Sequence, residues 1–176
     1  SRYKVARFFA GIYDWFFFKK AQHVSIIMAA ADNNAIKSFI ERSKGTIAPE
    51  KVNQFPTRYD ANIFKIMDRN ALRKKYGIDK DTVLYVTTGR LNWFKGWKFM
   101  IDCIDRLNNS LAKLVFIGDG EDEQKIKDYI SVRKLDEQII LLGRKPLEVI
   151  AEYLNMADAF IMGSYKEGWS TSLVEA

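Results

Sequence analysis

The sequence predicts a doubly wound, Rossmann-like parallel α/β sheet over residues 61–176, preceded by part of a second α/β domain over residues 1–60. From residue 82 onward, short runs rich in Val, Ile and Leu alternate regularly with segments of helical character. The strand-like runs are almost continuously apolar, which is typical of parallel strands that helices cover on both faces.

Length and composition limit the class of protein. With 176 residues, 48% hydrophobic and 14% aromatic, the chain can bury a core, so disorder is not expected. No apolar run approaches the roughly 18 residues of a membrane span, and the start lacks a signal-peptide pattern. We therefore expect a cytoplasmic protein. The single cysteine, Cys103, is expected to be a small buried side chain in a reducing compartment.

The net charge of +6 is concentrated near the start of the chain. Residues 1–60 carry ten Lys and Arg against five Asp and Glu, which accounts for +5 of the +6. Residues 2–20 combine basic ends with six Phe and Trp side chains, and two interpretations stay open. A core helix is favoured, because the aromatic run is not a clean amphipathic stripe. The other is a peripheral contact at the inner face of a membrane. Nucleic acid is the weakest option, since no motif for it is present.

The first part of the chain predicts a few short elements. The helix over 2–20 is followed by a buried strand at 23–28, a helix at 29–42 that stops at Gly45, and a second apolar stretch at 51–55. His23 stands at the mouth of a strand without a carboxylate partner, so we expect it to be structural. No His, Asp or Cys cluster has metal-ligand spacing.

The rest of the chain predicts the main sheet. A basic helix at 68–76 ends at Gly77, and a final helix follows Ser170. Between them we expect strands at 82–88, 112–117, 138–142 and 157–162, with helices at 95–107, 121–132 and 146–156. In such sheets ligands bind beyond the carboxyl ends of the strands, so the residues that follow each strand are the candidates for a site.

Three of the strand ends carry glycines or cations. After the first come Gly89 and Arg90, then Lys95, where a helix is expected to begin. A cation is disfavoured at a helix N-terminus, and a bound anion such as a diphosphate would relieve this. The second strand ends in Gly118 and Gly120, and the third is followed by Arg144.

The last strand leads to two carboxylates that flank a helix start. Glu167 precedes a Ser-Thr-Ser cluster that offers an N-cap, and Glu175 lies about a turn into the helix. A helix N-terminus suits a phosphate, and a carboxylate can accept hydrogen bonds from sugar hydroxyls. This stretch indicates a phosphorylated sugar ligand.

Taken in order, these motifs resemble those of the retaining group 1 (family 4-like) glycosyltransferases of the GT-B fold. The matching motifs are Gly-Arg-Leu…Lys-Gly from Gly89, Gly-x-Gly from Gly118, and Glu-x7-Glu from Glu167 to Glu175. The family's passage between domains is matched at Pro56, Asp60 and Phe64, but Thr57 and Arg58 depart from it. The resemblance implies that residues 1–60 end an acceptor-side N-terminal domain. Residues 61–176 would then form most of a donor-binding domain, truncated at its C-terminal end.

The resemblance also implies roles for individual residues. Arg90 and Lys95 would hold the donor's diphosphate and stabilise the leaving group, and Glu167 would contact the transferred sugar. Glu175 would accept hydrogen bonds from the ribose. The other donor-binding positions that it implies are Gly89, Gly118, Gly120, Arg144, Gly168, Trp169, Ser170, Thr171, Ser172 and Leu173.

The expected function is transfer of a sugar from a nucleotide-diphosphate-sugar to a glycan or lipid-linked acceptor, with retention, in polysaccharide biosynthesis. The resemblance implies no metal and no cofactor beyond the nucleotide-sugar co-substrate, whose base the sequence does not identify. A fragment of this kind is expected to be inactive alone. Two alternatives stay open: a non-catalytic nucleotide-sugar binding module, and a basic protein that binds a membrane surface.

Overall fold

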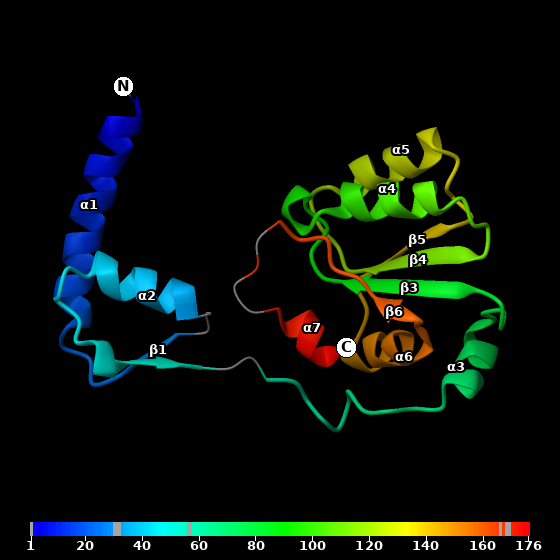
Figure 1. Ribbon diagram of the computed structural model, residues 1–176, viewed down its shortest axis with the longest axis horizontal. Coiled ribbons are helices and arrows are strands. Elements are labelled where there is room, and N and C mark those ends of the chain that lie inside the picture. Colours follow the sequence, from blue (N-terminus) through cyan, green and yellow to red (C-terminus); the bar gives the residue numbers. More distant parts are fainter. Residues whose placement is uncertain (1, 30–32, 56–57, 166, 168–169) are drawn as a thin grey trace. The chain divides into compact units, whose positions relative to one another are not determined.

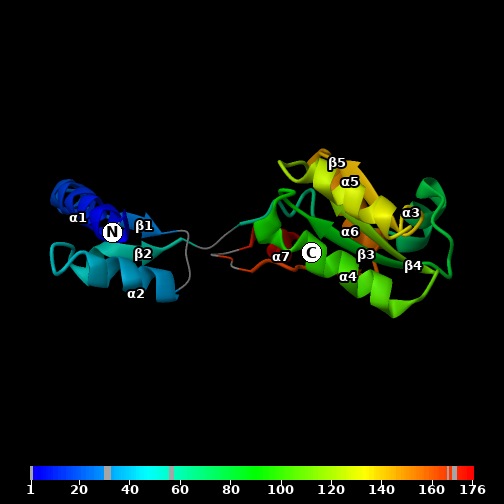
Figure 2. The same ribbon diagram turned by 90° about the horizontal axis from the view of Figure 1, so that it is seen from above.

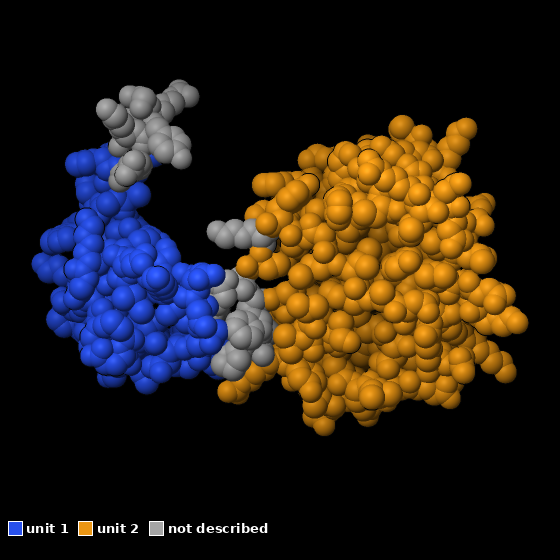
Figure 3. Space-filling model, viewed as in Figure 1, with its two compact units in different colours: residues 1–57 blue, residues 58–176 orange. Residues whose placement is uncertain are grey.

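The structure is a computed structural model that describes residues 2–29, 33–55, 58–165, 167 and 170–176. The chain divides into two compact units, Ser1–Thr57 and Arg58–Ala176 (Figure 3). Each unit has its own secondary structure and its own buried side chains.

Unit 1 contains two helices and a small parallel sheet. Strands β1 (Ile27–Ala29) and β2 (Val52–Gln54) pair in parallel, with Ile27 opposite Val52. The remaining elements are α1 (Arg2–Ala21), α2 (Asn33–Arg42) and the 3₁₀ turn η1 (Pro49–Lys51). The two helices are joined by a bidentate ion pair, in which the Arg42 guanidinium donates to both carboxylate oxygens of Asp14 at 2.5 and 3.2 Å.

The favoured interpretation of residues 2–20 as a core helix is wrong for most of α1. Phe18 is buried and packs edge-on against Phe39 of α2. Consecutive residues of a helix point about 100° apart, so a run of adjacent aromatics cannot all face a unit that offers one other helix and two short strands. Six aromatic side chains of α1 are accordingly between 43% and 69% exposed: Phe8, Phe9, Tyr13, Trp15, Phe16 and Phe17.

Unit 2 is a three-layered α/β structure around a four-stranded parallel sheet, as predicted (Figures 1 and 2). The strand order is β5 (Ile139–Gly143), β4 (Ala112–Ile117), β3 (Val83–Thr88), β6 (Ala159–Phe160). One face is covered by α4 (Trp97–Leu107) and α5 (Glu123–Val132), and the other by α3 (Arg69–Tyr76) and α6 (Leu147–Met156). Two short elements complete the unit, the 3₁₀ turn η2 (Trp93–Lys95) and α7 (Thr171–Glu175).

The pleat of the central strand β4 supplies both cores. Leu114 and Phe116 belong to the hydrophobic cluster under α4 and α5, whereas Val115 and Ile117 belong to the cluster under α6. All four are at most 2% exposed, so the strand is buried on both faces. This explains the unbroken apolar run at 114–117, since a strand with one solvated face would alternate with polar residues.

Two predictions about the first helix of this sheet need correction. The helix begins at Trp97 rather than at Lys95, because Gly96 adopts a left-handed conformation (φ 67°) that ends η2 and separates it from α4. Cys103 is exposed rather than buried. The buried residues of α4 are Met100, Ile101 and Ile104 beside Trp97, and Cys103 lies off that stripe.

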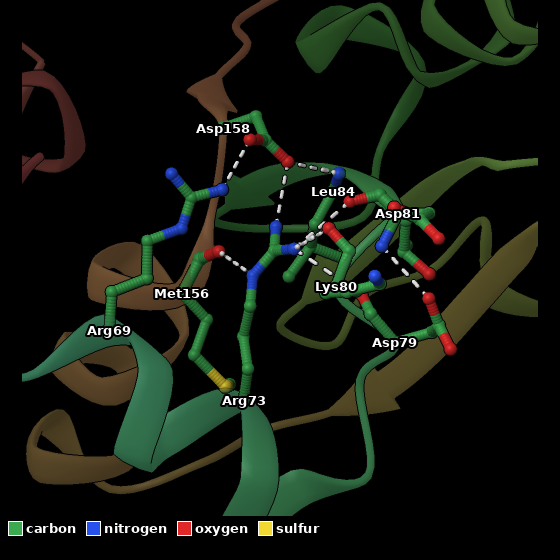
Figure 4. A network of polar contacts seen from close by, with 9 residues as sticks. Arg69, Arg73, Asp79, Lys80, Asp81, Leu84, Met156 and Asp158 are labelled. Carbon is green, nitrogen blue, oxygen red and sulfur yellow. Dashed lines mark hydrogen bonds and ion pairs between the residues drawn. The ribbon is translucent and has the colours of Figure 1, made fainter.

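A network centred on Arg73 fastens α3 to the sheet (Figure 4). The Arg73 side chain is only 7% exposed and donates to the Asp158 carboxylate at 2.7 Å. It also donates to four backbone carbonyl groups, those of Met156, Asp79, Lys80 and Thr82. Asp158 in turn accepts from Arg69 and from the backbone N–H of Leu84, so α3, β3 and the start of β6 share one set of hydrogen bonds.

Candidate functional site

The loops that follow the strands β3 and β6 enclose a hollow at the carboxyl edge of the sheet. Five of the residues predicted for the site line it: Gly89, Arg90, Lys95, Glu167 and Ser170. They come from loops more than 70 residues apart in the sequence, so the fold brings together what the motifs predicted only one by one.

The closest polar contact in the hollow joins Lys95 and Glu167. The Lys95 ammonium donates to a Glu167 carboxylate oxygen at 2.5 Å, and the two side chains are 34% and 23% exposed. The side chain of Asn92 caps η2 by accepting from the Lys95 N–H. From its place at a helix start, we expected Lys95 to need a bound anion for charge compensation. The structure shows that it does not depend on one. Glu167 supplies the opposite charge.

Burial and pairing act in opposite directions on the Glu167 carboxyl group. Partial burial alone would raise its pKa, but the hydrogen bond and the positive charge of Lys95 outweigh this and lower the pKa below its ordinary value. Glu167 is therefore ionised at neutral pH and can act as a hydrogen-bond acceptor there.

Arg90 connects this hollow with a second one. Gly89 and Arg90 line both, and the second hollow is also lined by Gly118 and Arg144, two further predicted residues. Arg90 and Arg144 are exposed. At Gly89 (φ 134°) nothing lies within 4 Å of the position that a Cβ atom would occupy, so a ligand could approach the backbone there.

The glycines of the second strand end pack closely against the backbone of the loop that follows β3. A Cβ atom at Gly118 would lie 1.9 Å from the Gly89 carbonyl oxygen, and one at Gly120 would lie 2.2 Å from that of Leu91. The close approach that these glycines allow is therefore between neighbouring loops of the protein. Backbone hydrogen bonds hold the same loops together, from Leu91 N–H to the carbonyl oxygen of Asp119 and from Asp122 N–H to that of Leu91.

The predicted N-cap of the last helix is confirmed. The Ser170 hydroxyl accepts from the Leu173 N–H at 3.4 Å, and Ser172 donates to the carbonyl oxygen of Thr88 at the end of β3. Thr171 is exposed. The predicted residues Gly168 and Trp169 lie outside the described residues.

Glu175 lies apart from the other predicted side chains. It ends α7 and lines a separate hollow with Tyr59, Phe64 and Asn155. Burial raises the pKa of its carboxyl group. The sequence spacing placed Glu175 about a turn into the helix, and in the structure it does not line the hollow that holds the Lys95–Glu167 pair.

Sequence reasoning missed three residues at this edge. Thr88 Oγ1 is buried, lines the first hollow and has no hydrogen-bond partner in the described part of the chain, so it is available to a ligand. Trp97 lines the same hollow, and its indole N–H donates to the buried Asp122 carboxylate at 3.1 Å. Only the position of Thr88 as the last strand residue offered a signal in the sequence. Among the described residues, no group of three His, Cys, Asp or Glu side chains is placed to hold a metal ion.

A Rossmann-like parallel sheet with two cations and a paired carboxylate beyond its strand ends defines a class of protein that binds phosphorylated, nucleotide-like ligands. The particular family follows from comparison with known proteins. The pattern of the family described as "Glycosyl transferases group 1" matches residues 68–176, and the chain belongs to this family.

Relatives and solved structures agree with this assignment. An uncharacterized glycosyltransferase of Methanocaldococcus jannaschii is 27% identical over 165 residues, which cover 91% of this chain and 38% of that protein. The putative teichuronic acid biosynthesis glycosyltransferase TuaC of Bacillus subtilis is 32% identical over 108 residues, covering 61% of this chain and 25% of that protein. A crystal structure of Anabaena Alr3699/HepE in complex with UDP-glucose superimposes with a TM-score of 0.76 at 18% identity, over 97% of this chain and 47% of that one.

These comparisons confirm the predicted family and the GT-B type of fold. The chain spans less than half the length of each of these three proteins.

Proposed function

We propose that the protein moves a sugar from a nucleotide-diphosphate-sugar donor to a glycan or lipid-linked acceptor, with retention of configuration and without a metal ion. The observation that carries the proposal is the Lys95–Glu167 ion pair beside Arg90, at the carboxyl edge of the sheet in a member of this family. It brings a cation that suits a phosphate within 2.5 Å of a carboxylate that suits sugar hydroxyls.

In this proposal the donor binds with its diphosphate at the two cations. Arg90 and Lys95 neutralise the negative charge that develops on the leaving nucleoside diphosphate, so they lower the barrier by electrostatic stabilisation. Glu167 accepts hydrogen bonds from the transferred sugar and fixes its orientation. The exposed Arg144 and the open backbone at Gly89 border the space left for the nucleotide.

Retention is proposed to occur by attack on the face from which the leaving group departs. The acceptor hydroxyl forms a bond to the anomeric carbon while the bond from that carbon to the phosphate oxygen breaks. The departing phosphate takes the hydroxyl proton. The site then needs no separate base, and Glu167 can stay ionised and paired with Lys95.

Calorimetric titration of the protein with UDP, GDP, ADP and CMP tests donor binding. UDP is the first choice because the Anabaena structural neighbour is a complex with UDP-glucose. Binding of one nucleoside diphosphate should weaken roughly 10- to 100-fold in Arg90→Ala, the effect of losing a charged hydrogen bond. Arg106→Ala, an exposed arginine at the other end of α4, is the control and should bind normally.

The outcomes separate the alternatives. If no nucleotide binds to the folded protein, the proposed donor site is wrong. Because a fragment is expected to be inactive alone, transfer and donor hydrolysis are measured on the full-length protein, and binding without either would favour the non-catalytic binding module. NMR of the anomeric configuration of the product tests retention, and an inverted product would exclude the same-face step.

We also propose that α1 contacts an anionic membrane surface from the cytoplasmic side. The supporting observation is its six exposed aromatic side chains together with Lys19 and Lys20 in its last turn. Among the described residues no helix is both long and apolar enough to cross a bilayer.

Co-sedimentation with vesicles containing phosphatidylglycerol tests this contact. Binding should occur at low salt, fall as salt is raised, and weaken in Phe16→Ala. Phe99→Ala, which removes an aromatic ring of similar exposure from α4, is the control. Failure to sediment at low salt would contradict the contact.

A further inference from the structure

Asp122 is a buried carboxylate at the carboxyl edge of the sheet that the proposed chemistry does not use. Its side chain is 3% exposed and lies in the loop between β4 and α5. One carboxylate oxygen accepts from the Trp97 indole N–H at 3.1 Å, and the other accepts from the Lys125 ammonium at 2.5 Å. A buried carboxylate is costly unless such partners satisfy it, so its presence in this loop requires a physical reason.

The partners of Asp122 show which segments it connects. Its backbone N–H donates to the carbonyl oxygen of Leu91, and its side chain holds Trp97. These two contacts lie on either side of Lys95, before and after η2. Asp122 therefore forms hydrogen bonds at both ends of the segment that carries Lys95.

Trp97 connects Asp122 with the candidate site. Its indole is 9% exposed, belongs to the core under α4 and α5, and lines the hollow that contains Lys95 and Glu167. Gly120, in the same loop as Asp122, packs against the Leu91 backbone so closely that a Cβ atom would lie 2.2 Å from its carbonyl oxygen. The two loops thus meet through backbone contact as well as through the Asp122 side chain.

We infer that Asp122 is a positioning residue, which sets the place of Lys95 for the donor's phosphate by holding Leu91 and Trp97. The inference rests on the proposed function. Lys125 has a 72% exposed side chain and balances the charge of Asp122 without touching the hollow. The hydrogen bond from Trp97 is therefore the part of the arrangement that acts on the site.

The affinity of the protein for UDP, measured by calorimetry, tests the inference. Asp122→Ala and Trp97→Phe should each weaken UDP binding at least about fivefold, as expected when one hydrogen bond that orders a binding loop is lost. The double variant should bind no more weakly than the weaker single variant, because the hydrogen bond that Trp97→Phe removes is already lost in Asp122→Ala. Asp122→Asn keeps an oxygen that can accept from the indole, so it should restore most of the affinity.

A control separates positioning from stability. Ile130→Val loosens the same core at the far end of α5 and should lower the melting temperature without changing the UDP affinity. NMR supplies a second readout, since the chain has four tryptophans and Trp97→Phe identifies the indole signal that should shift in Asp122→Ala.

The possible failures are distinct. If the unaltered protein binds none of UDP, GDP, ADP and CMP, the proposed function fails and this inference falls with it. If the unaltered protein binds UDP and Asp122→Ala binds it equally well, the positioning role alone is wrong. The same follows if the affinity of every variant tracks its melting temperature, including that of Ile130→Val.

Discussion

Replacing Arg73 by methionine should destabilise unit 2 strongly while leaving donor binding intact. Methionine keeps most of the apolar volume but removes every hydrogen bond of the guanidinium group. The buried carbonyl groups of Met156 and Thr82 then lose their partners, at about 1–3 kcal/mol for each unsatisfied group. The carbonyls of Asp79 and Lys80 lie in part-buried contacts and can be hydrated instead.

Removing the ion pair of Arg73 with Asp158 costs less free energy of unfolding than removing a fully buried pair would. Its side chain is 33% exposed and keeps hydrogen bonds from Arg69 and from the Leu84 N–H. Taking the lower end of each term, about 1 kcal/mol for each of the two carbonyl groups and about 1 kcal/mol for the partly exposed ion pair, the sum is about 3 kcal/mol, near the lower end for breaking a buried ion pair. For a unit of this size that loss corresponds to a decrease of roughly 12 °C in melting temperature.

Differential scanning calorimetry measures this change, and Arg69→Met is the matched control. Arg69 shares the carboxylate of Asp158, but its side chain is 43% exposed, so its loss should cost under about 1 kcal/mol. Equal destabilisation by the two variants would refute the assignment of the stability to the buried hydrogen bonds. UDP affinity, measured at a temperature where both variants are folded, should not change.

Three further predictions concern pH, backbone space and metal ions. Burial alone would raise the pKa of Asp158, but the Leu84 N–H and the two arginines lower it below the unfolded value of about 3.9. The ionised carboxylate therefore adds to the free energy of unfolding above that pH. Denaturant titrations should show this contribution disappearing as the pH falls further, and Asp158→Asn should remove that part of the pH dependence. Gly118→Ala would place a Cβ atom 1.9 Å from the Gly89 carbonyl oxygen, and it should lower both the melting temperature and the UDP affinity. An unaltered affinity would show that the loops after β3 and β4 can separate freely. UDP affinity in the presence of excess EDTA should be unchanged, and a loss restored by Mg²⁺ would contradict the metal-independent proposal.

The architecture of unit 2 could be predicted from the sequence because local signals and tertiary structure agree there. The strand β4 has the predicted bounds, since its apolar run is short and is followed directly by Gly118. Helix α3 ends at Gly77 in a left-handed conformation, and its start is capped by Asp68, as such residues indicate. Gly89, Arg90, Lys95 and Glu167 could be predicted because each follows a strand end.

Other features depended on partners that are distant in the sequence. Arg73 lies in a basic segment that resembles a solvated helix, and only the carbonyl groups around it explain its burial. Asp122 stands in a polar run after Gly120, and its partner Trp97 is 25 residues away. For α1 the pattern did contain the answer, because adjacent aromatics cannot all face one side of a helix. We took the lack of a clean amphipathic stripe as evidence for a core helix, although the same pattern means that most of these side chains cannot be buried against one face.

The two ends of the strands in unit 2 differ in how completely their charges are satisfied. At the amino end, Arg73 directs its donors to five acceptors, and Asp158 accepts hydrogen bonds from three donors, so the buried charges there have partners within the protein. At the carboxyl end, Arg90 is exposed, Thr88 Oγ1 has no partner among the described residues, and the Lys95–Glu167 pair lines an open hollow. Burial without a partner is costly, so the unsatisfied groups belong where a ligand can satisfy them. A buried charge at one end therefore indicates a contribution to stability, and the incompletely satisfied groups at the other end lie where we propose that the donor binds.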